Sequence, residues 1–176
     1  VGTEMAFILS RLGLELIWLT GREPLSSSAF SAPARAALRE ALAQAGIRPR
    51  LQSRIAAVGT GDAGVTLTLA DGERMVVDWV LAGTGRKPRT DGLDLARAGV
   101  ALDAEGHVRV DEYNRAAPGI YAIGDVANPG MSANHALADA AVAVSDMLEP
   151  GRRRRADEQV PQVLYSALEL ARVGLN

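Results

Sequence analysis

The sequence predicts an α/β fold that carries a small β-meander. Three patterns predict it: a helix followed by an apolar run at residues 14–19, three β-like runs between residues 51 and 79, and an apolar strand at residues 120–123 followed by a long helix. A helix that leads into a short apolar strand is the second half of a βαβ unit. We therefore expect a nucleotide-type α/β domain in the first part of the chain.

Composition excludes several classes of protein. The 176 residues are 48% hydrophobic, enough to bury a core in one domain or in pieces of two. With 19 basic and 21 acidic residues the net charge is −2, so no nucleic-acid partner is expected. The absence of cysteine excludes disulfides and thiol chemistry within these residues. No apolar run reaches the roughly 18 residues of a membrane span, and we expect a cytoplasmic protein without a membrane partner.

Apolar spacing and stop signals predict two helices near the start. The first ends at Gly13, and residues 14–19 follow it as a buried strand. The second begins near Pro33 and ends at Gly46. The strand that would precede the first helix in a βαβ unit is missing from the sequence.

Short β-like runs follow the second helix, and Asp71-Gly72 predicts a tight hairpin turn between two of them. The expected strands are residues 51–58, 65–69, 75–79 and 80–83. The first three form the meander, and the fourth ends in Thr84-Gly85-Arg86.

The second half predicts a short strand at residues 107–110, a buried strand at 120–123, and a last strand from residue 162 that the chain has no room to complete. A long helix lies between the last two strands. The apolar residues along one of its faces are Ala133, Ala136, Leu137, Ala140, Ala141, Val144, Met147 and Leu148.

Gly2 stands at a helix start that precedes a strand. This position fits the last glycine of a Gly-x-Gly-x-x-Gly dinucleotide loop, where the helix packs closely on the strand and its N-terminus faces a pyrophosphate. Two of the three glycines are absent, so a plain helix-start glycine is an equal alternative.

The end of the strand at residues 14–19 is where such folds select the ribose. An acidic residue there binds the 2′-hydroxyl of NAD, whereas an arginine accommodates the 2′-phosphate of NADP. Thr20 occupies the strand end, and Arg22 follows within reach of a phosphate. This favours NADP. Glu23 leaves NAD as an alternative, and an equal alternative is that Arg22 is a solvated turn residue.

The strand at residues 120–123 delivers Gly124-Asp125 at its carboxyl end, where open α/β sheets bind ligands. Asp125 can accept hydrogen bonds from sugar or ribitol hydroxyls. The helix that starts near Met131 to Ala133 can present backbone N–H groups to a ring or a phosphate. The alternative is that Asp125 only caps a turn.

Two histidines and an arginine run carry weaker signals. We expect His107 on the surface and His135 in the helix opening, without a metal cluster around either. The run at residues 152–155 lacks interleaved aromatic residues and is followed by acidic ones, so it is interpreted as a solvated linker.

Taken in order, these segments resemble the flavin-dependent pyridine nucleotide–disulfide oxidoreductases, the family of dihydrolipoamide dehydrogenase, glutathione reductase and mycothione reductase. The resemblance covers almost the whole chain. The segments that carry it are residues 1–6, the Thr-Gly-Arg-Lys-Pro segment at 84–88, residues 93–111, the Gly-Ile-Tyr-Ala-Ile-Gly-Asp-Val segment at 119–126, and residues 160–175.

The resemblance implies FAD and NAD(P)H as cofactors, with Asp125 on the flavin ribitol, the backbone at 131–133 beside the flavin, and Glu4 near the nicotinamide. No catalytic residue is expected within the chain. The implied cofactor-binding residues are Gly2, Glu4, Thr20, Arg22, Gly85, Gly124, Asp125, Met131, Ser132 and Ala133. The departures from the family pattern are Ala116 for threonine, Asn134 for histidine, and a missing proline in residues 166–169.

The resemblance also implies a domain division: an NAD(P)-binding domain at residues 1–86 that lacks its first strand, the C-terminal part of an FAD-binding domain at 87–150, and a linker with the start of an α+β dimerisation domain at 151–176. It implies a fragment of a homodimeric enzyme that passes hydride from NAD(P)H through FAD to a small disulfide. The alternatives are a quinone-type flavin reductase without a redox cysteine pair, and a non-catalytic nucleotide-binding relic.

Overall fold

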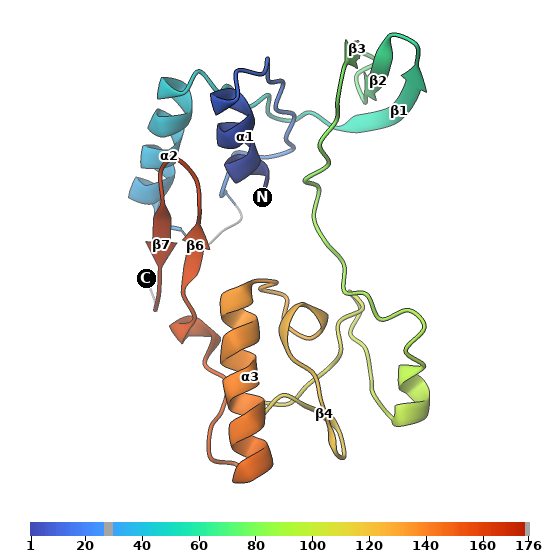
Figure 1. The fold of residues 1–176 in the computed structure, drawn as a ribbon, viewed down its shortest axis with the longest axis vertical. Coiled ribbons are helices and arrows are strands. Elements are labelled where there is room, and N and C mark those ends of the chain that lie inside the picture. Colours follow the sequence, from blue (N-terminus) through green and yellow to red (C-terminus); the bar gives the residue numbers. More distant parts are fainter. Residues whose placement is uncertain (27–29, 175–176) are drawn as a thin grey trace. The chain divides into compact units, whose positions relative to one another are not determined.

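The computed structural model describes residues 1–26 and 30–174, which divide into two compact units. The first unit comprises residues 1–84 and 163–171. The second comprises residues 85–162 and the segment that starts at Arg172. Figure 1 draws the elements of both units in sequence colours.

The first unit contains the two helices that the sequence predicts. Helix α1 spans Gly2–Arg11 and is followed by Gly13 with φ +78°. Helix α2 spans Ala32–Gln44, and the Ser31 side chain caps it by accepting the backbone N–H of Ala34. Both predicted helices are confirmed.

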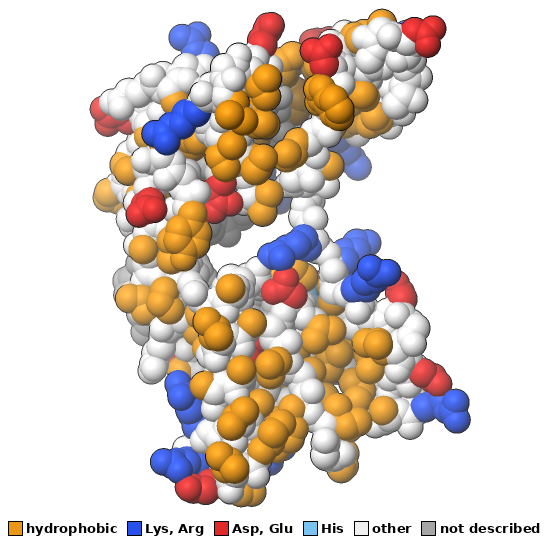
Figure 2. Space-filling view, viewed as in Figure 1, with side chains coloured by type: hydrophobic (Ala, Val, Ile, Leu, Met, Phe, Trp, Pro, Cys, Tyr) orange, Lys and Arg blue, Asp and Glu red, His pale blue; other side chains and the backbone are white. Residues whose placement is uncertain are grey.

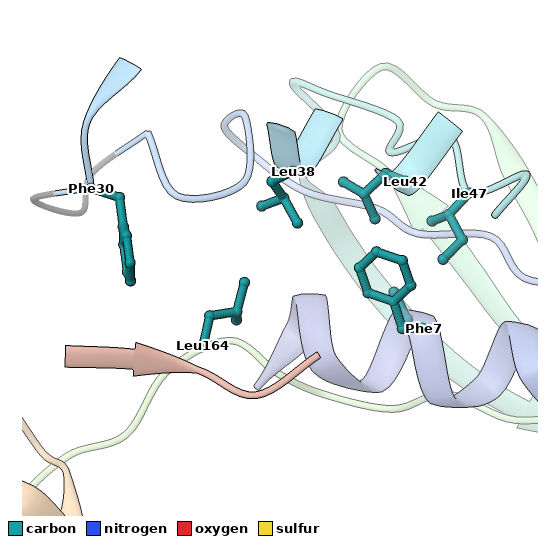
Figure 3. Close-up of a cluster of buried hydrophobic side chains, with 7 residues drawn as sticks. Phe7, Phe30, Leu38, Leu42, Ile47 and Leu164 are labelled. Carbon is teal, nitrogen blue, oxygen red and sulfur yellow. The ribbon is translucent and has the colours of Figure 1, made fainter. Parts of the chain in front are cut away.

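A cluster of buried apolar side chains holds the first unit together. Figure 3 shows Phe7 from α1 facing Leu42 and Ile47, with Leu38 of the same helix as Leu42 close by. Leu164 of strand β6 (Gln162–Leu164) joins the cluster from the far end of the sequence. The cluster consists of Ala6, Phe7, Phe30, Leu38, Leu42, Ile47 and Leu164. A segment near the end of the chain is therefore part of the core of the first unit.

The predicted meander is confirmed. Strands β1 (Ile55–Gly61), β2 (Gly64–Leu69) and β3 (Arg74–Val77) form an antiparallel sheet in sequence order. The predicted hairpin turn at Asp71-Gly72 joins β2 to β3, and Gly72 adopts the left-handed φ of +90° that tight turns require. Strand β1 starts at residue 55 instead of 51, because residues 51 and 52 form a turn.

Two predicted strands of the first unit are wrong. Residues 14–19 are extended but not in a sheet: their single strand-like pairing is a parallel bridge from Leu19 to Arg50. Residues 80–83 pair with no described strand. Leu14 is 56% exposed, so the first segment is not buried either. An apolar run becomes a sheet strand only when neighbouring strands satisfy its backbone, and the described residues supply none here beyond that bridge.

The second unit is built from short elements around one long helix. Strands β4 (Arg115–Ala117) and β5 (Ile120–Tyr121) form a hairpin, and α3 spans Ala133–Leu148. The predicted strand at 107–110 is wrong, since it is reduced to a bridge between Leu102 and Val108. The remaining short elements are the 3₁₀ turns η1 (Leu95–Ala98), η2 (Gly124–Val126) and η3 (Asp157–Gln159).

The strand expected from residue 162 does find a partner. Strand β6 pairs with β7 (Leu170–Arg172), so the prediction that the chain has no room to complete it is wrong. The strand at 120–123 is shorter than predicted and only partly buried, with Ile123 40% exposed. Among the described helices, none has the length and apolar character to cross a membrane.

Helix α3 buries a face other than its predicted apolar stripe, and that face includes polar side chains. Leu137 and Leu148, which belong to that stripe, are 71% and 78% exposed. Figure 2 shows apolar side chains gathered on the visible surface of the molecule. The side chains that α3 buries are His135, Asp139, Val142, Ala143 and Asp146. A buried carboxylate is tolerated only with hydrogen-bonding or charged partners, so the surrounding segments must supply them.

Asp146 obtains its partners from the β4–β5 hairpin. The guanidinium of Arg115 donates two hydrogen bonds of 2.6 Å to its carboxylate, and the Tyr121 hydroxyl donates a third at 2.8 Å. The backbone N–H of Gly151 donates a fourth at 2.7 Å. The Arg115 hydrogen bonds, followed by those from Gly151 and Tyr121, outweigh desolvation and lower the pKa of Asp146 to about 2.

This lowered pKa predicts an acid-dependent stability. Because the folded-state pKa lies below the unfolded value, the Asp146 contribution is complete above about pH 4 and is lost between about pH 4 and pH 2. We expect the stability difference between the wild type and Asp146→Asn to shrink over that window, as measured by urea unfolding at each pH. A difference that stays constant from pH 6 to pH 2 would contradict this assignment.

Candidate functional site

The turn at Gly124 requires glycine for two reasons. Its φ is +68°, and a Cβ added there would lie 3.1 Å from the Cβ of Ala136 on α3. The Gly124 carbonyl accepts the N–H groups of Ala127 and Asn128, at 2.9 and 2.7 Å. The turn is therefore closed upon itself and packed against the first turn of α3.

Asp125 lies within this turn with its carboxylate accessible. Its side chain is 47% exposed, and Oδ2 accepts a hydrogen bond from Arg86 Nη1 at 2.8 Å. The other terminal nitrogen of Arg86 donates to the carbonyl oxygen of Met131. Arg86 thus joins the Asp125 carboxylate to the segment that leads into α3.

The N-terminus of α3 is capped on one side and open on the other. The Ser132 hydroxyl accepts the backbone N–H of His135 at 3.3 Å and lies 2.7 Å from His135 Nδ1. A Cβ at Gly130 would lie within 2.8 Å of three atoms of the His135 ring, so a side chain there would displace the ring. The N–H groups of Ala133 and Asn134 have no acceptor inside the helix, and neither donates a hydrogen bond to another part of residues 1–26 and 30–174.

The residues predicted for the flavin side therefore lie together. Gly124 and Asp125 precede a short loop, Met131 is linked to Asp125 through Arg86, and Ser132 and Ala133 open the helix. Their contacts all lie within the second unit.

Four residues predicted for the pyridine nucleotide side, Gly2, Glu4, Thr20 and Arg22, lie on two segments of the first unit. Gly2 begins α1, where a Cβ would be 3.8 Å from Trp18 Nε1. A Cβ at Gly83 would be 3.6 Å from the Cα of Gly2, so the segment 80–83 passes beside this helix start. Glu4 accepts the backbone N–H of Tyr165 at 3.1 Å through Oε1, which holds its carboxylate near the start of α1.

Thr20 and Arg22 form a separate local turn. The Thr20 hydroxyl donates to the Arg22 carbonyl at 2.8 Å and accepts the Arg22 N–H at 3.4 Å. Glu23 is engaged elsewhere, since its carboxylate pairs with Arg39 at 2.6 Å. Within residues 1–26 and 30–174, neither Thr20 nor Arg22 hydrogen-bonds to Gly2 or Glu4. Gly85 lies in the second unit, exposed, with φ +114°.

The sequence interpretation missed the side chains that support this site. Arg86 and Asn128 were not singled out, although each contacts the loop around Asp125 or the residues after it. Asp139 was also missed, and an acidic residue inside an otherwise apolar helix was the available signal. His107 was expected on the surface and is 7% exposed. The 103–107 turn is closed by hydrogen bonds between Asp103 and the His107 backbone, and the next residue, Val108, belongs to a buried apolar cluster, so the chain carries His107 inward with it.

In the described part of the chain, no three histidine, aspartate or glutamate side chains gather as metal ligands would.

Comparison with known proteins identifies the class. Residues 1–142 match the family described as pyridine nucleotide-disulphide oxidoreductase, and the chain belongs to this family. Members of the family are FAD-dependent NAD(P)H oxidoreductases that act on disulfides. The resemblance expected from the sequence is confirmed.

Particular relatives agree with this assignment. The chain is similar to the dihydrolipoyl dehydrogenase of Thermus scotoductus, with 38% identity over all of this chain and 39% of the relative. It is 35% identical to a glutathione reductase of Burkholderia cepacia, again over all of this chain and 39% of that protein. The crystal structure of LpdA from Mycobacterium tuberculosis matches 98% of this chain and 38% of its own, with a TM-score of 0.90 and 28% identity. The chain thus spans about two fifths of the length of these relatives.

The Gly124 turn can be tested against a second glycine of the same unit. Gly119 also has a positive φ, +74°, but a Cβ there would meet nothing within 4 Å. We expect Gly119→Ala to cost about 1–2 kcal/mol for the left-handed backbone alone. Gly124→Ala should cost more, because the new methyl group also crowds Ala136. Equal losses in the free energy of urea unfolding would show that the contact with α3 is unimportant.

Proposed function

We propose that this chain supplies part of the flavin site and part of the pyridine nucleotide site of an oxidoreductase that passes hydride from NAD(P)H through FAD to a small disulfide substrate. The observation that carries the proposal is the arrangement of an open Asp125 carboxylate and an open α3 N-terminus, joined by Arg86. The chain contains no cysteine, so the disulfide chemistry requires residues other than these 176.

The second unit has donors and acceptors that suit FAD. The exposed Asp125 carboxylate can accept hydrogen bonds from ribitol hydroxyl groups. The free N–H groups at Ala133 and Asn134 present positive partial charge, which suits an electron-rich ring edge or a phosphate. Gly124 keeps the backbone before Asp125 close to α3, where a Cβ would crowd Ala136. FAD bound there would accept hydride from NAD(P)H and pass the electrons on.

In the first unit, the proposed roles concern the second cofactor. Gly2 allows the start of α1 to approach the pyrophosphate, and Glu4 stands near the nicotinamide. Arg22 is the proposed partner of the 2′-phosphate of NADPH, supported by an exposed position after Thr20 and by the pairing of Glu23 with Arg39. Gly85, which belongs to the second unit, is proposed as a further cofactor-binding residue.

We extend the proposal to the protein as a whole. The domain division is residues 1–86 for NAD(P) binding, 87–150 for the FAD domain, and 151–176 for the linker and the start of a dimerisation domain. The whole protein is proposed to act as a cytoplasmic homodimer.

A quinone-type flavin reductase is the second candidate, because the 176 residues contain no cysteine. A Cys-x-x-x-x-Cys pair elsewhere in the protein would favour the disulfide reductase.

The flavin proposal predicts a specific loss on removal of one carboxylate. In the full natural protein, Asp125→Asn should weaken FAD binding by about tenfold to a hundredfold, the range expected for hydrogen bonds to a charged group. The measurement is the FAD dissociation constant from quenching of flavin fluorescence. The matched control is Glu105→Gln, an exposed carboxylate of the same unit, which should leave the constant unchanged. Failure of the wild type to bind FAD would refute the proposed function.

The preference for NADPH rests on Arg22. Arg22→Ala should raise the KM for NADPH about tenfold or more, since a charge-assisted contact to phosphate is lost, while the KM for NADH stays within twofold. The control is Arg11→Ala, which removes an exposed guanidinium at the C-terminal end of α1. An unchanged ratio of the two KM values would exclude Arg22 as the phosphate partner.

A further inference from the structure

Asp139 is the most deeply buried charged group near the candidate flavin site. It lies on α3 and is 2% exposed. The proposed function assigns it no role, because it is turned away from solvent and cannot meet a ligand directly. Its hydrogen-bond partners, however, come from the two segments that carry the site.

The first of these segments is the turn before Asp125. Oδ2 of Asp139 accepts the backbone N–H of Gly124 at 3.1 Å. Gly124 is the residue whose left-handed backbone turns the chain toward Asp125. The hydrogen bond therefore sets the direction in which the chain leaves the turn and presents the Asp125 carboxylate.

The second segment is the loop that enters α3. The side-chain amide of Asn128 donates to the Asp139 carboxylate, 3.2 Å from Oδ2 and 3.4 Å from Oδ1. Asn128 in turn organises the loop: its Oδ1 accepts the N–H of Gly130 at 2.9 Å, and its carbonyl accepts the N–H of Met131 at 3.0 Å. Through Asn128, the same carboxylate holds the approach to the open helix N-terminus.

Two further contacts hold Asp139 itself. The side chain of Asn114, which is fully buried, donates to the Asp139 carbonyl at 3.0 Å. The guanidinium of Arg155 approaches within 3.6 Å of Oδ1. All of the polar groups that face the carboxylate are donors, so an acceptor with two oxygens is needed at this position.

From these contacts we infer that Asp139 is a positioning residue for flavin binding. It fixes the Gly124 turn and the Asn128 loop relative to each other, so that the Asp125 carboxylate and the α3 N-terminus can bind the same ligand. The inference rests on the proposed FAD site and adds to it the buried group that preorganises the site.

The chemistry predicts which substitutions are tolerated. In Asp139→Asn one oxygen becomes an NH₂ group, which would face N–H donors and lose at least one of their hydrogen bonds. Asp139→Glu keeps both acceptor oxygens and can rescue the contacts. The same helix offers a matched control, because Asp146 is equally buried but binds the β4–β5 hairpin and the Gly151 backbone instead.

The experiment measures FAD affinity and the visible circular dichroism of bound flavin in the full natural protein. Asp139→Asn should weaken FAD binding about tenfold or more and change the dichroism band, while Asp139→Glu stays within threefold of the wild type. Asp146→Asn should lower the unfolding temperature yet leave both flavin measurements unchanged. If Asp139→Asn does not fold, Asn128→Ala takes its place, with an expected loss of about threefold to tenfold in FAD affinity.

Two results would overturn the inference while leaving the proposed function intact. One is wild-type affinity for FAD in Asp139→Asn, or in Asn128→Ala where the first variant does not fold. The other is an equal loss of affinity in the Asp139 and Asp146 variants, which would mean that the helix is merely destabilised. Absence of FAD binding by the wild type would instead refute the flavin site itself.

Discussion

The constraint on which the second unit depends is the burial of two carboxylates on one face of α3. A buried charge without partners is strongly unfavourable, so each carboxylate determines the arrangement of the segments that satisfy it. Asp146 fixes the β4–β5 hairpin through Arg115 and Tyr121. Asp139 fixes the loops around Gly124 and Asn128. The exposed site residue Asp125 thus lies on a framework held by polar contacts beneath it.

The first unit is stabilised mainly by apolar contacts and not by buried carboxylates. Its core is apolar, formed where α1 and α2 meet and completed by Leu164 from the end of the chain. Apolar contacts are not directional, so this core sets which faces are buried without setting the conformation of the flanking turns. The turn after Thr20 combines local hydroxyl contacts between Thr20 and Arg22 with backbone hydrogen bonds that join Thr20 to Arg50 and Ser53. The residues proposed to recognise the pyridine nucleotide lie on this turn and at the start of α1, where Glu4 accepts the N–H of Tyr165.

The sequence predicts an element of this structure well when the interactions that form it join residues close together in the sequence. The start of α2 near Pro33, the stop at Gly13 and the hairpin turn at Asp71-Gly72 rest on neighbouring residues, and all three were predicted correctly. The strands at residues 14–19 and 80–83 were not, because a strand requires partners that an apolar pattern does not reveal. The apolar stripe of α3 was likewise a poor guide to its buried face, since Leu137 is exposed and Asp139 is buried.

The candidate site shows the same division. The sequence by itself predicted Gly124, Asp125 and a helix start near Met131 to Ala133, because a glycine that must turn, an acid that follows it and the beginning of an apolar helical pattern are all properties of adjacent residues. Only the tertiary structure decided that Arg86 binds Asp125 and that Asp139 holds Gly124, across 39 and 15 residues of sequence. Such contacts depend on the path of the chain between the partners. Charge and hydrogen-bonding capacity can be read from a sequence, but the partner that satisfies them is chosen by folding.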